Sequence, residues 1–293
     1  MKALVIVAPT VDGDTRDALR VALHYHLVAP AHSCELYEVR PHEDIAAAVA
    51  RLVDDRFDCV VAVGGDGTVS AVAHALVDKP VPLGIVPAGT GNLVARELAI
   101  PLDIEAAVGL LTGPRHTRRI DAMRINGRTF LLNAGVGINA EVIDETSRLG
   151  KSLFGRSAYV GTAVWKVLQA KPQRMVVSLD GAEATYHATD IAISNCGILA
   201  KALNPNGPDV RVDDGRLDVC ILCMKTPLEY PWYYFLKRIA PQRVNRIMHE
   251  LSATRRVTVS SDAPLVVQAD GDIIGTTPVS VDVLPNALAV IVP

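Results

Sequence analysis

The sequence predicts two domains of different class, a doubly wound α/β domain over residues 1–121 and a β-sandwich over residues 122–293. Three observations lead to this prediction. Apolar runs alternate with helical stretches as far as Asp121, and two of those runs end in glycine-rich loops. After Asp121, short strand-like runs separated by turn residues take over. Only this change of periodicity marks the domain boundary.

The first domain is predicted from strands and helices in alternation. Short apolar runs bounded by turn residues are expected to form buried strands, at Ala3–Val7, Glu35–Val39 and Cys59–Val63. Helices are expected to begin at Thr15 and Asp44, and a later one at Asp103, whose side chain can cap it. Gly113-Pro114 ends that last helix. The order of elements is that of an open, mostly parallel sheet.

The second domain is predicted from strands that turn residues separate. Strands are expected in MRINGRTFLLNAG, GRLDVCILCM, RRVTVSS, PLVVQADGD and ALAVIVP, and two more in RMVVSLDGAEATYHATDIAISN. Two helical inserts are expected to interrupt them, at residues 157–168 and 227–251. Many short strands with regular turn signals are typical of a β-sandwich.

Composition limits the classes of function. Of the 293 residues, 49% are hydrophobic, which is enough for large cores without disulfides. The net charge of −3 gives no general attraction for nucleic acid, so no nucleic-acid partner is expected. The apolar start Ala3–Pro9 is too short to span a membrane, and five scattered cysteines fit a reducing compartment. We therefore expect a cytoplasmic globular protein.

Two glycine-rich loops each lie between an apolar run and a helical stretch. They are VAVGGDGTVSAV (Val61–Val72) and LGIVPAGTGNLVAREL (Leu83–Leu98). Glycine lets a ligand approach the main chain and leaves N–H groups exposed, which suits a phosphate. Carboxyl ends of parallel strands lie at one edge of a sheet, so both loops are expected there. One such loop is typical of a tight turn, but the pair predicts a phosphate site.

Aspartates at strand ends and turns add to this pattern. Asp66 lies in the first glycine loop, Asp121 at the domain boundary, and Asp270 and Asp272 in the turn QADGD. Phosphoryl transfer needs main-chain donors for the phosphates, Mg²⁺ on carboxylates and a base for the hydroxyl proton. Each aspartate alone is typical of a turn, but the combination with two phosphate loops favours catalysis.

Five segments, by order and spacing, resemble the diacylglycerol kinase and sphingosine kinase-like lipid kinases of bacteria. The similarity spans nearly the whole chain, and GGDGT is shared with NAD kinases. The resemblance implies an ATP- and Mg²⁺-dependent lipid kinase of phospholipid metabolism, with its active site between the two domains. The segments are GGDGT (64–68), PAGTGNLVAR (87–96), RIDAMRINGRTFLLNAGVGINAEV (119–142), VDDGRLDV (212–219) and QADGD (268–272).

The resemblance also implies catalytic and nucleotide-binding residues. Either Asp270 or Asp272 would accept the proton, and the sequence does not choose between them; Asp66 is the third catalytic candidate. ATP binding is implied for three loops and one arginine, that is for Ala8, Pro9, Thr10, Val11, Asp12, Arg40, Gly64, Gly65, Asp66, Gly67, Thr68, Val69, Ser70, Gly89, Thr90, Gly91 and Asn92.

Two metal sites follow from the same resemblance. Asp66 and Asp121 would serve the catalytic Mg²⁺. In RVDDGR, the Asp214 side chain and the carbonyl groups of Arg211 and Arg216 would form a structural Mg²⁺ loop.

Two other functions stay open at this stage. An NAD kinase-like enzyme would share GGDGT, but it would need polar groups that read a second nucleotide. A non-catalytic regulator that binds lipid or nucleotide is indicated by Leu93, because many relatives have aspartate there and one metal carboxylate is then missing. The lipid, the choice between ATP and GTP and the oligomeric state, a homodimer included, are also open.

The segment Pro227–Ile247 is predicted to touch the membrane surface that holds the lipid. It combines aromatic rings suited to the headgroup level with cations that attract anionic lipid, namely Trp232, Tyr233, Tyr234, Phe235, Lys237, Arg238, Arg243 and Arg246. Four consecutive aromatic residues cannot share one helix face, so an ordinary packed helix is the alternative.

Overall fold

Four parallel strands form the sheet of the N-terminal domain. The computed structural model describes residues 1–27, 32–113, 116–137, 140, 171–203, 209–224, 229 and 247–293. Strands β1 (Lys2–Val7), β2 (Ser33–Glu38), β3 (Cys59–Gly64) and β4 (Leu83–Pro87) lie in the order β2-β1-β3-β4. The residues of β3 and β4 are all buried because helices cover both faces of the sheet.

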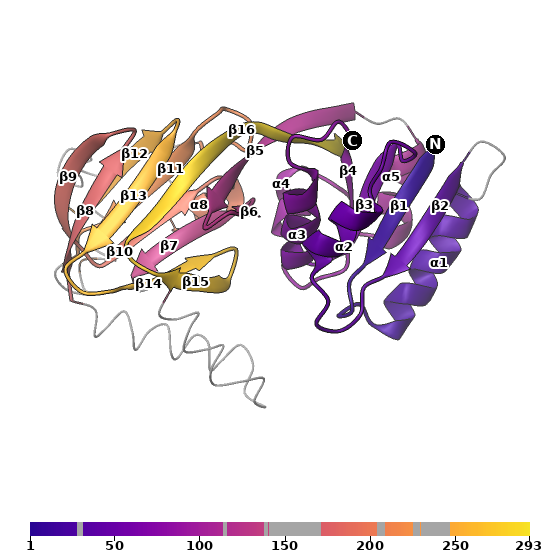
Figure 1. Cartoon of the computed structure of the whole chain (residues 1–293), viewed down its shortest axis with the longest axis horizontal. Coiled ribbons are helices and arrows are strands. Elements are labelled where there is room, and N and C mark those ends of the chain that lie inside the picture. The colour runs from indigo at the N-terminus through magenta and orange to yellow at the C-terminus, as the bar shows by residue number, and fades with distance from the viewer. Residues whose placement is uncertain are drawn as a thin grey trace.

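The helices divide between the two faces of this sheet (Figure 1). Helices α1 (Gly13–Leu27) and α5 (Ile104–Thr112) pack on one face, and α2 (Ile45–Leu52), α3 (Asp66–Leu76) and α4 (Leu93–Glu97) on the other. The predicted cap is present, because Asp103 accepts a hydrogen bond from the N–H of Ala106, and Asp44 caps α2 in the same way through the N–H of Ala47. The predicted doubly wound class is confirmed.

The C-terminal domain is a sandwich of two sheets. One is wholly antiparallel, in the order β12-β11-β10-β7-β14-β15. Its strands are β7 (Asn133–Gly137), β10 (Asp190–Ser194), β11 (Leu217–Leu222), β12 (Met248–Ala253), β14 (Val266–Ala269) and β15 (Asp272–Thr276). A short helix, α8 (Gly197–Leu203), follows β10.

The facing sheet contains the remaining strands. These are β5 (His116–Ile125), β6 (Arg128–Phe130), β8 (Gln173–Leu179), β9 (Ala182–Ala188), β13 (Arg256–Ser261) and β16 (Val279–Val292). Alternate residues of both sheets, among them Met123, Ile191 and Val257, form one buried core between the sheets. The predicted β-sandwich is confirmed.

Two predicted elements are wrong. Residues 174–195 form three strands rather than two, because Asp180 and Gly181, both with positive φ, turn the chain between β8 and β9. The helix predicted to reach Leu251 does not include Met248–Ala253, which is strand β12 paired with β11. The rest of that prediction, apart from Glu229 and Ile247, and the insert at 157–168 lie outside the described residues.

The last strand joins the two domains. The first part of β16 pairs with β13 in the sandwich, and near its end Val290 pairs with Leu83 of β4. The register shifts between Leu284 and Leu288, so the strand bends as it crosses. One ten-stranded sheet therefore runs through both domains, and both chain ends lie in the α/β domain (Figure 1).

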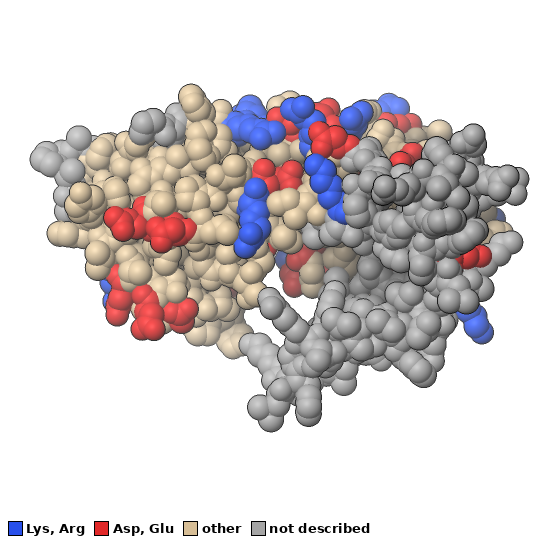
Figure 2. Space-filling view, turned by 180° about the vertical axis from the view of Figure 1, so that it is seen from behind, with Lys and Arg blue, Asp and Glu red and all other residues tan. Residues whose placement is uncertain are grey.

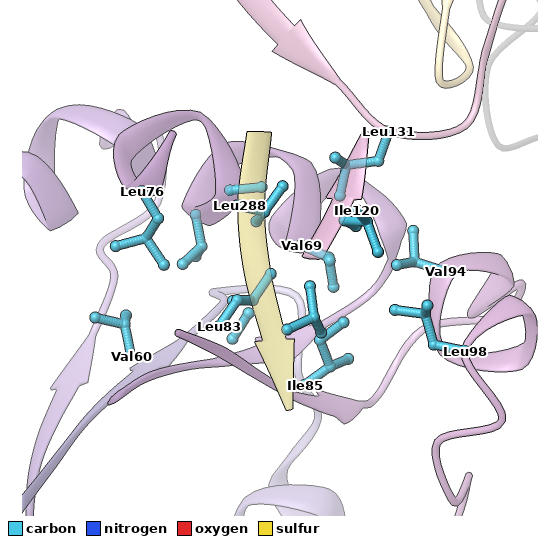
Figure 3. Packing of buried hydrophobic residues seen from close by; sticks show 14 of the residues in the cluster. Val60, Val69, Leu76, Leu83, Ile85, Val94, Leu98, Ile120, Leu131 and Leu288 are labelled. Carbon is cyan, nitrogen blue, oxygen red and sulfur yellow. The ribbon is translucent and has the colours of Figure 1, made fainter. Parts of the chain in front are cut away.

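The crossing strand adds side chains to the N-terminal core. Figure 3 shows Leu288 in one cluster with Leu76 and Val69 of α3 and with Leu131, near Ile120, its partner on β5. Leu288 is 1% exposed, so its burial depends on both domains being in place. The C-terminal strand is thus part of the core of the N-terminal domain.

The described residues form no broad basic area on the face in Figure 2. There, Lys and Arg side chains stand in small groups with Asp and Glu beside them. Among the described residues, no helix combines the length and the apolar character that a membrane span requires.

Candidate active site

The two glycine loops pack against each other, main chain to main chain. The first lies between β3 and α3, and the second between β4 and α4. A Cβ atom added to Gly89 would lie 2.4 Å from the Cα atom of Gly65, so a side chain on Gly89 would overlap the other loop. A Cβ atom on Gly64 would lie 2.5 Å from Oγ1 of Thr68. These glycines are therefore needed for packing, whatever ligand approaches the loops.

Asp66 connects the two loops. It is the first residue of α3, yet its Oδ1 atom accepts a hydrogen bond from the N–H of Val94, in the first turn of α4, at 3.1 Å. Asn92, with φ of +50°, closes its own loop, because its side chain binds both the N–H and the C=O of Gly89. Leu93, the first residue of α4, packs against the hydrophobic core. The charge of Asp66 is thus fixed where the loops meet.

The first loop of the chain lies at the same edge of the sheet. The carbonyl oxygens of Ala8, Pro9 and Val11 accept hydrogen bonds from the Arg16 guanidinium. Asp12 caps the start of α1 through the N–H and hydroxyl of Thr15, and these hydrogen bonds lower its pKa. Because β1 to β4 are parallel, this loop and both glycine loops meet at one edge.

The remaining residues that are predicted to bind the nucleotide differ in solvent exposure. Thr68, Val69 and Ser70 are buried on α3. Thr90 and Arg40 are exposed. The side chain of Arg40 forms no hydrogen bond or ion pair within the described part of the chain, so it is free to meet a ligand.

The late turn gives its two aspartates different surroundings. Asp270, with φ of +48°, accepts hydrogen bonds from the N–H groups of Leu131, Leu132 and Asn133 at 2.9 to 3.0 Å. It also accepts one from Oγ of Ser70 at 2.7 Å, which ties the turn to α3. Burial raises its pKa, and these hydrogen bonds oppose that rise.

Asp272 is exposed at the start of β15. Within the described chain, its carboxylate makes no hydrogen bond or ion pair, whereas both oxygens of Asp270 are occupied by two donors each. The geometry therefore distinguishes two residues that the sequence does not.

A cavity of about 690 Å³ connects the late turn with α3. Gly67, Ser70 and His74 of α3 line one wall, and Asp270 and Asp272 line another. The rest of the lining comes from α2 and from the β5–β6 hairpin, which contributes Arg128, Thr129 and Phe130. A volume of this size is typical of a small-molecule site.

Asp121 lies at the domain junction, with both carboxylate oxygens engaged. Oδ1 accepts the N–H of Asn286, at the bend of β16, and Oδ2 accepts the N–H of Gly215, each at 2.7 Å. Burial raises the pKa of Asp121, and these two hydrogen bonds oppose the rise. Asp121 therefore holds the bend of β16 and the RVDDGR segment together.

The predicted structural Mg²⁺ loop is held by arginines. Asp214 accepts hydrogen bonds from the N–H and Nε of Arg216, and Asp213 forms ion pairs with Arg118 and Arg211. In the described part of the chain, no group of three or more His, Cys, Asp or Glu side chains could hold a metal ion. Both metal sites stay predictions.

Sequence reasoning missed His74 and Arg128, which line the cavity. Nδ1 of His74 lies 3.0 Å from Oγ1 of Thr129, so α3 and β6 are joined here. Neither residue belongs to a glycine loop or an acidic turn, and only the tertiary fold brings them to Asp272. The predicted membrane segment Pro227–Ile247 lies outside the described residues, apart from Glu229 and Ile247.

Comparison with known proteins gives consistent matches over both domains. The diacylglycerol kinase catalytic domain family matches residues 2–125, and the YegS C-terminal NAD kinase beta sandwich-like domain family matches residues 133–292. A diacylglycerol kinase of Mycobacterium tuberculosis strain H37Rv is 30% identical over 263 residues, which cover 85% of this chain and 80% of that protein.

Two further matches bear on length and fold. An uncharacterized protein of Synechocystis sp. PCC 6803 is 32% identical over 239 residues, 80% of this chain and 54% of that protein, so the chain spans about half its length. The crystal structure of a diacylglycerol kinase from Bacillus anthracis str. Sterne has a TM-score of 0.72 and 20% identity, and the match covers 100% of this chain and 97% of that one. The structural match shows the fold.

Proposed function

The chain belongs to the diacylglycerol kinase family, and from this membership we propose that it transfers the γ-phosphate of ATP, with Mg²⁺, to a hydroxyl group of diacylglycerol or a related lipid. One observation supports the proposal most. The helix that follows the first glycine loop and the late turn, which come from different domains, line a single cavity. Phosphoryl transfer needs such a meeting of phosphate donors, carboxylates and acceptor.

The N-terminal loops are the proposed phosphate site. The start of α3 and the second glycine loop meet at the carboxyl edge of the sheet, where main-chain N–H groups and the helix dipole favour anions. Thr90 and Arg40, both exposed, can add a hydroxyl and a positive charge. We assign the triphosphate to this edge, with the nucleoside toward the loop Ala8–Asp12.

Asp272 is the proposed base. Accepting the hydroxyl proton requires a carboxylate oxygen that is not already occupied, and Asp272 is exposed with no partner among the described residues. Asp270 would have to give up one of four hydrogen bonds to do the same. Its proposed part is to position the turn that carries Asp272.

The donor set fits Mg²⁺ at Asp66. Oδ1 of Asp66 is bound by Val94, and Oδ2 makes no hydrogen bond within the described residues. Because Mg²⁺ takes most of its ligands from water and substrate phosphates, one or two carboxylates are sufficient. When bound, the ion would neutralise charge that develops on the transferred phosphoryl group. Asp121, the other predicted ligand of this ion, accepts one hydrogen bond on each oxygen and so keeps lone pairs that could join.

Two alternatives are separated by one experiment. The purified chain is given γ-labelled ATP with diacylglycerol, with extracted bacterial lipids and, separately, with NAD. We expect label in lipid and none in NAD. Label in NAD would indicate an NAD kinase-like enzyme. Label in neither, with ATP still bound, would support the regulator indicated by Leu93.

A pair of variants tests the base. Asp272→Asn should lower kcat by about 10²- to 10⁴-fold and leave thermal unfolding unchanged. Asp270→Asn should instead lower the unfolding free energy by about 2 to 3 kcal/mol, because its NH₂ group would face two hydrogen-bond donors. If Asp272→Asn turns over at the wild-type rate, Asp270 is the next candidate for the base, and if Asp270→Asn also turns over normally, Asp66 follows. Contact of Pro227–Ile247 with a membrane, the cytoplasmic location and the oligomeric state stay predictions.

A further inference from the structure

The cavity lies beside the proposed nucleotide site and extends away from it. Of the residues predicted to bind ATP, only Gly67 and Ser70 line it. The loop Ala8–Asp12, the second glycine loop and Arg40 do not. Its wall between α2 and α3 is small and apolar, formed by Ala46, Ala47, Ala50, Ala71 and Ala75. This space is therefore suited to the acceptor rather than to the nucleotide.

Most of the charged groups around the cavity are already engaged. Asp44 caps α2, Asp270 accepts four hydrogen bonds, and His74 meets Thr129. Asp272 and Arg128 remain, and neither has a hydrogen-bond or ion-pair partner in the described part of the chain. A carboxylate and a guanidinium without partners among the described residues thus line the same cavity.

Arg128 is held in place at the cavity. Its guanidinium carbon lies 5.3 Å from the centre of the Phe130 ring, a cation–π distance that orients the side chain without neutralising it. Nδ2 of Asn126 donates to the carbonyl oxygen of Ile274 at 3.3 Å and so holds the β5–β6 hairpin against β15. Arg128 follows Asn126 by two residues, and Asp272 precedes Ile274 by two, so this contact joins the two segments that carry these residues.

We propose that Arg128 binds an anionic group of the acceptor, so that the enzyme prefers a lipid with a phosphate ester close to the hydroxyl it phosphorylates. The inference rests on the proposed function and narrows its acceptor. A planar guanidinium binds phosphate through paired hydrogen bonds, and the free hydroxyl of such a headgroup then reaches Asp272. The wall of alanine side chains accommodates the apolar part of the lipid next to this headgroup. Arg128 could instead bind a phosphate of the nucleotide, and the test distinguishes these two ligands.

The test compares two acceptors with equal acyl chains in the same nonionic micelles. Short-chain diacylglycerol is neutral, and short-chain phosphatidylglycerol has a phosphodiester beside free hydroxyl groups. The full chain is assayed as wild type, as Arg128→Met, which keeps length and packing but removes the charge, and as Arg128→Lys. Lys171→Met, an exposed cation that does not line the cavity, is the matched control.

We expect wild type to have the higher kcat/KM with the anionic acceptor. Arg128→Met should lower that value by about 10- to 100-fold, the usual effect of losing a charge-assisted hydrogen bond. The neutral acceptor, the KM for ATP and the control should change less than about threefold, and Arg128→Lys should restore part of the loss. Equal losses with both acceptors, a raised KM for ATP or no preference in wild type would overturn the inference.

A binding measurement keeps the two proposals apart. Monomeric short-chain phosphatidylglycerol is titrated into each variant without ATP. Transfer to neither lipid would count against the proposed kinase, whereas binding that Arg128→Met abolishes would still support the anionic site. Binding that is unchanged in Arg128→Met would reject the site even in an active kinase.

Discussion

At the scale of single residues, hydrogen-bond donors divide the aspartates into two groups. Asp270 and Asp121 have both oxygens occupied, mainly by backbone N–H groups, and they join segments far apart in sequence. Among the described residues, one oxygen of Asp66 and both oxygens of Asp272 accept no hydrogen bond. Carboxylates whose oxygens all accept hydrogen bonds stabilise the fold by joining these segments, and an oxygen without a donor is better placed to meet a proton or a metal ion.

The free oxygen of Asp66 leads to a prediction with two variants. Asp66→Asn keeps an acceptor for the N–H of Val94 but removes the charge, so phosphoryl transfer should fall by at least about 10²-fold, with stability within about 1 kcal/mol of wild type. Asp66→Ala also loses the hydrogen bond between the loops and should destabilise by about 1 to 2 kcal/mol. Kinetics and urea unfolding measure the two effects. Normal turnover in Asp66→Asn would exclude a role for its charge.

Asp218 on β11 predicts a pH dependence of stability. Burial raises its pKa to about 6 from a usual value of 3.8, with Arg216 opposing the rise, and its buried Oδ2 atom has no hydrogen-bond partner among the described residues. A raised pKa in the folded state contributes stability below the unfolded pKa, and this contribution is lost as pH rises through the folded value. Wild type should therefore lose stability relative to Asp218→Asn between about pH 4 and pH 7, as judged from these two pKa values.

The size of this effect is about 1 kcal/mol, after allowance for the partial exposure of Asp218. Urea unfolding of both proteins at several pH values gives the difference directly, and other titrating groups cancel. A difference that does not vary with pH would show that Asp218 has an ordinary pKa.

At the scale of elements, the two glycine loops are one structural unit. Gly65 and Gly89 lie against each other, and Asp66 and Asn92 fix the loops from either side. The helix starts that would face a phosphate are therefore set by contacts between loops. Changes in one loop should act on both.

A matched pair of glycine variants tests this unit. Gly89→Ala puts a Cβ atom 2.4 Å from the Cα atom of Gly65. Because main chain cannot move aside without disturbing the loop, we expect the free energy of unfolding to fall by about 1 to 3 kcal/mol and ATP binding to weaken. Gly67→Ala has nothing within 4 Å and lies inside α3, so the fold should tolerate it. Calorimetry and ATP titration would measure both. Equal stability in the two variants would mean that the loops can separate without cost.

The same elements show which features of the fold and the site can be predicted from the sequence. The loops could be predicted because glycine between an apolar run and a helical stretch is a local signal, and the caps at Asp44 and Asp103 are equally local. The path of β16 could not be predicted, because an apolar run indicates burial but does not indicate which strand it pairs with. Arg128 and His74 carry no local signal, since β6 and α3 meet only in the folded chain. The end of the predicted helix at 248–251 failed because strand pairing with β11 overrides a weak periodicity.

At the scale of the whole molecule, the two domains are coupled by several connections. β16 runs through both, Ser70 of α3 binds Asp270 of the late turn, and Glu97 of α4 accepts the N–H of Ile198 at the start of α8. The proposed base and the proposed phosphate site belong to different domains, so their distance depends on these connections. These connections keep the two halves of the site close to each other.

This coupling predicts that the domains unfold together. Leu288 belongs to the C-terminal strand but is buried in the N-terminal core, next to Leu76 and Ile120 (Figure 3). Leu288→Ala should destabilise by about 2 to 5 kcal/mol through lost burial and the cavity left behind. Because β16 also pairs with β13, amide exchange should accelerate by a similar factor in β3 and in β8 of the sandwich, and unfolding should remain a single transition. Val177→Ala in β8, buried only in the sandwich core, is the reciprocal control and should produce the same pattern. Exchange that accelerates in β3 alone would mean that the nucleotide domain opens independently, and the cavity would then be formed by two separately stable units.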